Sequence, residues 1–284
     1  MRKRPGFGSL LLIGGHEDKD DDKTILRFFA KKVGKAGKVV VATVASEEPR
    51  RLFDEYEACL RGLGMRHVHH LSVESREDAA LESKTRILSD ADSVFFTGGD
   101  QIRISSQIGD TPLFRRVHQI FDSGGLIAGT SAGASVMTET MMVSGPAEQS
   151  YRMESLLRLA PGFGLLPGVI VDQHFAERGR IGRLLGAIAQ NPRILGIGLD
   201  EDSAIFVRRA RFQVIGSASV HVIDGGKVTF SNIAESEPET SLSIYGVKLH
   251  VLNQSDTFDL KTRKPHFHPS REIRDWLGLP AKKE

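Results

Sequence analysis

Short apolar runs alternate with longer amphipathic segments through the first half of the chain, and this alternation constrains the fold more than any other feature. The apolar runs cover residues 10–13, 39–44, 67–73, 93–96 and 126–128. The segments between them place apolar residues at the spacing of a helix face: 23–33, 50–63, 76–89 and 113–123. Strands that alternate with helices in this way predict an α/β fold, in which a mostly parallel sheet carries helices on both faces.

The pattern changes in the second half of the chain. A further helix is predicted at 181–190, and short runs with tight turns predict an antiparallel meander at 203–207, 212–215, 220–223 and 227–230. Two more strands are expected at 247–253 and 257–260, and a last helix at 271–277. Because no linker-like stretch separates the halves, we expect a single domain over 1–284, with an α/β core at 1–210 and a β-rich extension at 211–284.

Charge and cysteine content exclude several classes of protein. The 284 residues include 38 Lys and Arg against 36 Asp and Glu, so the net charge of +2 gives no general electrostatic reason to bind nucleic acid. No apolar run approaches the roughly 20 residues that cross a bilayer. The single cysteine, Cys59, leaves neither an internal disulfide nor a cysteine-based metal cage. These bounds favour a cytoplasmic globular protein without membrane or nucleic-acid partners.

The segment Gly129-Thr130-Ser131-Ala132-Gly133 matches the G-x-S-x-G pattern of a nucleophile elbow. It directly follows an apolar run and opens an apolar segment that is expected to be helical, which is the context the pattern requires. Such a turn would present the Ser131 hydroxyl at a helix N-terminus, where N–H groups and the helix dipole favour developing negative charge. A glycine-rich turn with a serine N-cap is the simpler alternative. The context favours Ser131 as a nucleophile.

A second glycine-containing turn, with Gly98, Gly99 and Gln101, follows the predicted strand at 93–96. Neighbouring parallel strands bring their carboxyl ends to one rim of the sheet. The N–H of Gly98 or Gly99 would therefore form an oxyanion hole together with that of Ala132. The alternative is a turn that only caps a helix.

A serine nucleophile needs a base, and the chain offers ten histidines. Most of them lie within predicted strands or helices, or beside prolines near the end of the sequence. His16 follows two glycines at a strand end and is a credible rim residue. His174 is the best candidate, because it follows the apolar strand at 168–172.

These motifs together resemble the family of cyanophycinases and aspartyl dipeptidases. Its members are serine peptidases on the class I glutamine amidotransferase-like, flavodoxin-like fold. The resemblance covers most of residues 10–210 and rests on five motifs in order: 14–19, 96–101, 129–134, 172–175 with the arginines that follow, and 198–204. The cyanophycinase branch is the closer likeness. His16 departs from the pattern, because family members more often have a small residue there.

The resemblance implies a role for each residue of a catalytic triad. Ser131 would be the nucleophile, His174 the general base and acid, and Glu201 the residue that orients the imidazole. The chain order Ser, His, Glu differs from that of the α/β-hydrolases and argues against a lipase or esterase. Glu148 would be the acid if the α/β-hydrolase order held, and it is the weaker candidate.

The resemblance also implies cleavage of cyanophycin, a poly-aspartate whose side chains carry arginine through isopeptide bonds, into β-Asp-Arg dipeptides. Substrate carboxylates would need cationic partners, for which Arg178, Arg180 and Arg183 are available after His174; a solvated helix face is the simpler interpretation of these arginines. The acceptors available for the substrate guanidinium are Gln101, Asp172, Gln173 and Glu17. No metal or organic cofactor is required, and the family suggests a homodimer.

Three other functions remain open on the residues alone. An aspartyl or isoaspartyl dipeptidase keeps the mechanism and changes the substrate. A glutamine amidotransferase domain would use a cysteine nucleophile, whereas Ser131 occupies the elbow and Cys59 lies in a predicted helix. A non-catalytic binding module would usually lose a member of the triad.

Overall fold

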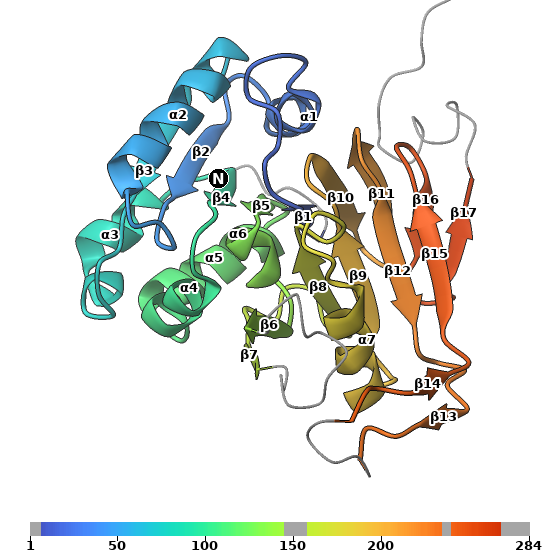
Figure 1. Ribbon diagram of the computed structural model, residues 1–284. Helices are drawn as coiled ribbons and strands as arrows, with labels where there is room; N and C mark the ends of the chain where they lie inside the picture. Colours follow the sequence, from blue (N-terminus) through green and yellow to red (C-terminus); the bar gives the residue numbers. More distant parts are fainter. Residues whose placement is uncertain (1–6, 145–157, 235–239, 268–284) are drawn as a thin grey trace, which may run out of the picture.

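The computed structural model describes residues 7–144, 158–234 and 240–267. Two β-sheets lie side by side with helices packed against them (Figure 1). Glu148 and the predicted helix at 271–277 lie outside the described residues. Within the described part of the chain, no helix is long and apolar enough to cross a membrane.

The larger sheet has nine strands in the order β17-β16-β11-β10-β1-β5-β4-β2-β3. Its parallel part consists of β1 (Ser9–Ile13), β2 (Lys38–Ala42), β3 (His67–Leu71), β4 (Ser93–Phe96) and β5 (Leu126–Thr130). Its antiparallel part consists of β10 (Ser203–Arg208), β11 (Arg211–Gly216), β16 (Thr257–Asp259) and β17 (Lys264–His266). Strand β1 joins the two parts, because it pairs parallel to β5 and antiparallel to β10.

The smaller sheet has four strands in the order β15-β12-β9-β8. They are β8 (Val169–Gln173), β9 (Leu195–Leu199), β12 (Val220–Asp224) and β15 (Lys248–Leu252). Strands β8 and β9 are parallel, and the other pairings are antiparallel. Two short ribbons complete the strands: β6 (Thr140–Ser144) with β7 (Arg158–Pro161), and β13 (Phe230–Ser231) with β14 (Ile244–Tyr245).

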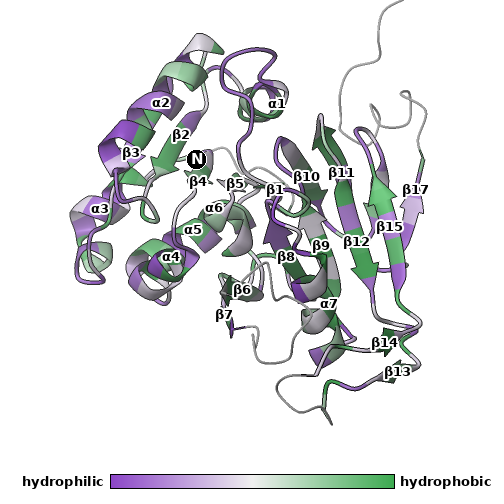
Figure 2. Ribbon diagram, viewed as in Figure 1, coloured by the Kyte–Doolittle hydropathy of each residue, from purple (hydrophilic) through white to green (hydrophobic). Residues whose placement is uncertain are grey.

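The helices cover both faces of the larger sheet and one face of the smaller. Helices α1 (Thr24–Val33) and α2 (Pro49–Gly62) pack on one face of the larger sheet. The opposite face carries a 3₁₀ helix (Asp78–Ala80), α3 (Glu82–Ile87), α4 (Gln101–Ile108), α5 (Pro112–Asp122) and α6 (Ala132–Ser135). Helix α7 (Ile181–Gln190) packs on the smaller sheet. Figure 2 shows hydrophobic and hydrophilic residues alternating around α2 and α4, as expected for helices with one buried face.

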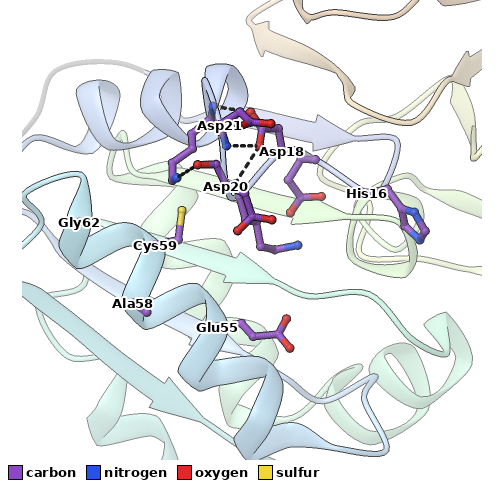
Figure 3. Close-up of a pocket in the computed structure, with 11 residues that line it drawn as sticks. His16, Asp18, Asp20, Asp21, Glu55, Ala58, Cys59 and Gly62 are labelled. Carbon is purple, nitrogen blue, oxygen red and sulfur yellow. Dashed lines mark hydrogen bonds between the residues drawn. The ribbon is translucent and has the colours of Figure 1, made fainter.

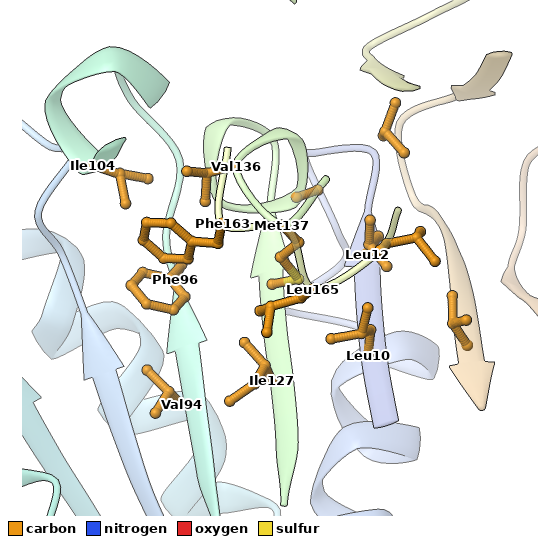
Figure 4. Packing of buried hydrophobic residues seen from close by; sticks show 14 of the residues in the cluster. Leu10, Leu12, Val94, Phe96, Ile104, Ile127, Val136, Met137, Phe163 and Leu165 are labelled. Carbon is orange, nitrogen blue, oxygen red and sulfur yellow. The ribbon is translucent and has the colours of Figure 1, made fainter. Parts of the chain in front are cut away.

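The strand residues divide the core by their two-residue period. Leu11 and Ile13 of β1 face α1 and α2, whereas Leu10 and Leu12 face the opposite side. The cluster on that opposite side continues into the smaller sheet, and Figure 4 shows Leu10, Leu12, Leu165 and Phe163 among the side chains of this cluster. One continuous apolar core therefore joins the two sheets and fixes the rim where their strands end.

The predicted α/β fold with a mostly parallel core is confirmed, and the helix at 181–190 has its predicted bounds. The predicted meander is wrong in its second half. Strands β10 and β11 form a hairpin in the larger sheet, but β12 leaves it and pairs with β9 in the smaller one. The chain turns away after Gly216, whose φ of 116° suits glycine. The division into one domain with an extension stays a prediction.

One expected helix needs correction, and one helix was missed. The helix expected at 76–89 is divided into the 3₁₀ helix and α3, because Leu81 between them has an extended backbone with a ψ of 135°. Helix α4 was not predicted, since its short apolar pattern is interrupted by Ser105 and Ser106. Its N-cap carries a clear signal, because the Asp100 carboxylate accepts a hydrogen bond from the N–H of Ile102.

Candidate active site

Ser131 lies in a strained turn between β5 and α6. Its φ of 52° and ψ of −113° are unusual for a residue with a side chain, and its N–H donates to the Ile13 carbonyl at 3.0 Å. The turn also requires close approach: a Cβ on Gly133 would lie 2.2 Å from the Phe96 carbonyl oxygen. The strand–turn–helix context expected for the G-x-S-x-G pattern is therefore present.

Ser131, His174 and Glu201 form a continuous hydrogen-bonded chain. The Ser131 Oγ lies 3.0 Å from His174 Nε2, and His174 Nδ1 lies 2.6 Å from a Glu201 carboxylate oxygen. His174 follows β8, and its N–H donates to the Gly14 carbonyl at 2.9 Å. Glu201 follows β9, and its N–H donates to Glu177 at 3.2 Å. The geometry fits a nucleophile, a base and an orienting acid.

The burial of His174 sets its charge. The residue is only 4% exposed, and this desolvation lowers the imidazole pKa below its ordinary value, more than the hydrogen bond to Glu201 raises it. The positive charge of Arg178 lowers the pKa further. A neutral imidazole with its proton on Nδ1 can accept the Ser131 proton on Nε2, as a general base must.

His16 is a close neighbour of the chain Ser131–His174–Glu201. Its Nδ1 lies 3.3 Å from the second carboxylate oxygen of Glu201, and its ring meets the His174 ring edge-on with centroids 5.2 Å apart. A Cβ on the preceding Gly15 would lie 2.3 Å from the His174 ring, so only glycine fits there. Within the described residues, a ligand atom of each of His16, His174 and Glu201 lies within 4.8 Å of the others, which makes them candidate metal ligands.

Of the three residues predicted for an oxyanion hole, Gly98 and Ala132 adjoin Ser131. A Cβ on Gly98 would lie 3.5 Å from the Ser131 Cβ, and Gly99 has a φ of 135° with its backbone packed on Ala45. Ala132 opens α6, so its N–H lies at a helix N-terminus. The role of these N–H groups in stabilising an oxyanion stays a prediction.

Arg180 and Arg183 face the protein interior instead of the open rim that the sequence suggested. Both are buried and pair with the fully buried Asp172: Arg183 Nε lies 2.7 Å from one carboxylate oxygen, and Arg180 Nη1 lies 3.2 Å from the other. A second Arg183 nitrogen also donates to Asp172, so this pair is bidentate. Burial lowers the pKa of Arg180 to about 10, which leaves it charged at neutral pH. In the structure, the anionic partner of both arginines is therefore the protein's own Asp172.

The other residues predicted to bind substrate have different environments. Gln101 donates to the Met142 carbonyl at 2.8 Å, and the Gln173 side chain accepts from Arg180 at 2.8 Å. Arg178 is exposed and lies near His174. Its exposure makes it the predicted residue best placed to meet a ligand, and the binding roles of all of them stay predictions.

Glu17, which the sequence suggested as an acceptor for substrate, is buried. It accepts hydrogen bonds from Tyr56 at 2.5 Å and from Thr130 at 2.6 Å. Burial and the Glu17 charge raise the pKa of Tyr56 well above its ordinary value. Sequence reasoning missed Tyr56 and Thr130, because nothing in their own segments marks them as neighbours of Glu17.

An open cavity of about 780 Å³ lies between the loop after β1 and helix α2. Figure 3 shows His16 at its edge and acidic side chains, including Asp20, Asp21 and Glu55, around it. The carboxylate of Asp18 is occupied by backbone N–H groups of its own loop, which lower its pKa to about 2. Because His16 lines the cavity and also lies beside Glu201, the cavity is adjacent to the three hydrogen-bonded residues Ser131, His174 and Glu201.

Comparison with known proteins identifies the family of this chain. The model of the family described as Peptidase family S51 matches residues 10–215. Similar proteins named cyanophycinase include those of Synechococcus elongatus (38% identical over 260 residues, 90% of this chain and 80% of the relative) and Geminocystis herdmanii (36%, 90% and 95%). A third, from Trichormus variabilis, is 38% identical and shares 90% of this chain and 86% of its own.

Two solved structures share the fold. A peptidase from an acI-B1 Actinobacterium aligns with a TM-score of 0.63 at 23% identity, covering 89% of this chain and 97% of its own. A putative peptidase E from Listeria monocytogenes aligns with a TM-score of 0.52 at 18% identity, covering 74% and 98%. The molecule is thus a peptidase with the amidotransferase-like α/β fold. More particularly, the chain belongs to peptidase family S51.

Proposed function

We propose that this protein is a serine-type exopeptidase that hydrolyses cyanophycin to β-Asp-Arg dipeptides. The observation that carries the proposal is the hydrogen-bonded chain from Ser131 through His174 to Glu201, in a member of peptidase family S51. The similarity to proteins named cyanophycinase over 90% of the chain supports the choice of substrate.

The proposed mechanism follows from the positions of the atoms. His174 Nε2 takes the Ser131 hydroxyl proton as Oγ attacks the scissile carbonyl, and Glu201 stabilises the imidazolium that forms. The N–H groups of Gly98 and Ala132 receive the negative charge of the tetrahedral oxyanion. His174 then returns its proton to the leaving amine, which leaves an acyl-enzyme on Ser131. Water, deprotonated by His174, hydrolyses this ester and restores the hydroxyl.

Substrate recognition in this proposal needs charges of both signs. Cyanophycin offers carboxylates and guanidinium groups, and the exposed Arg178 beside His174 is suited to a carboxylate. Arg180 and Arg183 would act indirectly, because their pairing with Asp172 fixes the segment that follows β8 and carries His174.

The deciding experiment incubates the purified protein with cyanophycin and, separately, with α- and β-linked aspartyl dipeptides. We expect β-Asp-Arg from the polymer, detected by mass spectrometry, and no release by the Ser131→Ala variant. Ser135→Ala is the matched control, since this buried hydroxyl has no hydrogen-bond partner among the described residues. Undiminished release by Ser131→Ala would refute the mechanism. Hydrolysis of the dipeptides alone would refute the substrate and favour a dipeptidase.

We also infer that the protein is a homodimer, on the basis of the family resemblance. Its composition leads us to infer that it lies in the cytoplasm. Light scattering coupled to size-exclusion chromatography would test the dimer, for which twice the chain mass of 31.2 kDa is expected. Cell fractionation with an antibody to the protein would test its location.

A further inference from the structure

His16 gives this active site a donor set that the proposed hydrolysis does not need. Its side chain is 72% exposed, and its Nδ1 approaches the Glu201 oxygen that His174 leaves free. The backbone of His16 has a φ of 48°, which is uncommon for a residue with a side chain. The backbone at His16 therefore carries a conformational cost, although the hydrogen-bonded Ser131–His174–Glu201 arrangement is complete without this residue.

Two imidazoles and one carboxylate are a ligand set that zinc and similar first-row divalent ions bind well. In a tetrahedral zinc site with bonds of about 2.1 Å, two ligand atoms lie about 3.4 Å apart. His16 Nδ1 and Glu201 already lie 3.3 Å apart, and all three ligand atoms lie within 4.8 Å of one another. Solvent reaches the site, because Glu201 is 27% exposed and His16 more so. Small side-chain movements would close the set around an ion.

The environment of the three ligands is compatible with a cation. The Glu177 carboxylate accepts from the Glu201 N–H and adds negative charge beside the site. Arg178 opposes it with a positive charge that acts on His174. The His174 ring is fixed against Gly15, so His16 is the ligand free to move toward an ion.

The geometry points to an inhibitory site for a divalent transition-metal ion, with zinc as its best-suited ligand, formed by His16 Nδ1, His174 Nδ1 and Glu201. A neutral imidazole has one proton, which in the active form lies on His174 Nδ1 and is donated to Glu201. An ion on Nδ1 moves this proton to Nε2, with no net release. Nε2 can then no longer accept the Ser131 proton, and the base is lost.

A binding measurement tests the site without any substrate. Zinc chloride is titrated calorimetrically into the Ser131→Ala protein, for which we expect one equivalent to bind. Adding His16→Ala should weaken the affinity at least about tenfold, because even loss of a residue that only supports a metal ligand costs this much. His16→Asn serves as a second variant, because asparagine tolerates a left-handed backbone. The matched control, His67→Ala with His69→Ala, removes exposed histidines on β3 and should leave the affinity unchanged.

A rate measurement tests the inhibition. Hydrolysis by the unmodified protein should fall with added zinc and recover with a chelator, while magnesium has no effect. The rate of each His16 variant is compared with its own zinc-free rate. Each variant should need at least about tenfold more zinc than the unmodified protein for the same fractional inhibition. Zinc affinity or inhibition that is the same without His16 would overturn the proposed site. One bound equivalent that leaves hydrolysis unchanged would overturn its inhibitory role.

Discussion

Three residues around the proposed site share a strained backbone. His16, Ser131 and His174 have φ values of 48°, 52° and 48°, although none is glycine. Each such residue costs of order 1–3 kcal/mol and persists only where its surroundings fix it. Here the fixing contacts are backbone hydrogen bonds from Ser131 to Ile13 and from His174 to Gly14. The strain therefore includes the nucleophile and the base of the proposed mechanism, together with their neighbour His16.

Replacing the acid of the proposed triad should slow the reaction strongly. Glu201→Gln keeps the shape but removes the charge that stabilises the His174 imidazolium, so we expect kcat to fall by about 10³- to 10⁴-fold. Steady-state hydrolysis measures this loss. Glu177→Gln is the control, since Glu177 reaches only the backbone of Glu201, and its effect should be small. Equal losses in both variants would contradict the assignment of Glu201.

The acid limb of the pH profile should report His174. Because burial lowers the imidazole pKa, kcat/KM should fall toward acid pH as His174 gains a proton, with a midpoint below the ordinary value of about 6.5. Arg178→Ala removes a charge that lowers this pKa, so the midpoint of the limb should move to higher pH. A midpoint above 6.5 in the unmodified protein, or no movement in the variant, would contradict His174 as the base.

At the scale of elements, the proposed site is assembled from loops that follow β1, β4, β5, β8 and β9. The rule that ligands bind beyond the carboxyl ends of parallel strands predicted this rim from the sequence. It also placed His174 and Ser131 near each other, because each follows an apolar strand. It could not predict that the strands end in two different sheets. That depends on β12 pairing with β9 and not with β11, a long-range choice without a local signal.

The loop after β1 should control the position of the base. A methyl group in Gly15→Ala would lie 2.3 Å from the His174 ring and would need a φ of 110°, so the ring must move. A displacement of 1 Å costs roughly 10²-fold in rate, which sets the expected fall in kcat. Gly164→Ala is the matched control, because its φ is also positive, at 69°, but nothing lies within 4 Å of the added carbon.

Comparing the two Gly→Ala variants separates the effect of displacing the His174 ring from the effect of backbone strain at a positive φ. Both should lose some stability in thermal unfolding, because alanine disfavours a positive φ by roughly 1–2 kcal/mol. At a temperature where both variants remain folded, only Gly15→Ala should lose activity. Full activity in Gly15→Ala would contradict the packing of Gly15 against His174.

At the scale of the whole molecule, the arginines after His174 show where sequence reasoning ends. The sequence suggested substrate carboxylates as the partners of Arg180 and Arg183, whereas the structure pairs both side chains with Asp172. Whether a charge is buried depends on how α7 packs against the smaller sheet, which no local pattern contains. The cluster ties the end of β8 to the start of α7.

Neutralising Asp172 should therefore destabilise the molecule. Asp172→Asn leaves two buried guanidinium groups without their anion, and breaking a buried ion pair in this way costs about 3–5 kcal/mol. Denaturant unfolding measures the free energy of unfolding. Glu82→Gln is the control: it breaks an exposed pair with Arg86, whose side chains are 83% and 72% exposed, and should cost at most about 0.5 kcal/mol. If Asp172→Asn unfolded at the control's denaturant concentration but raised KM, Asp172 and its arginines would bind substrate directly, and their structural role would be refuted.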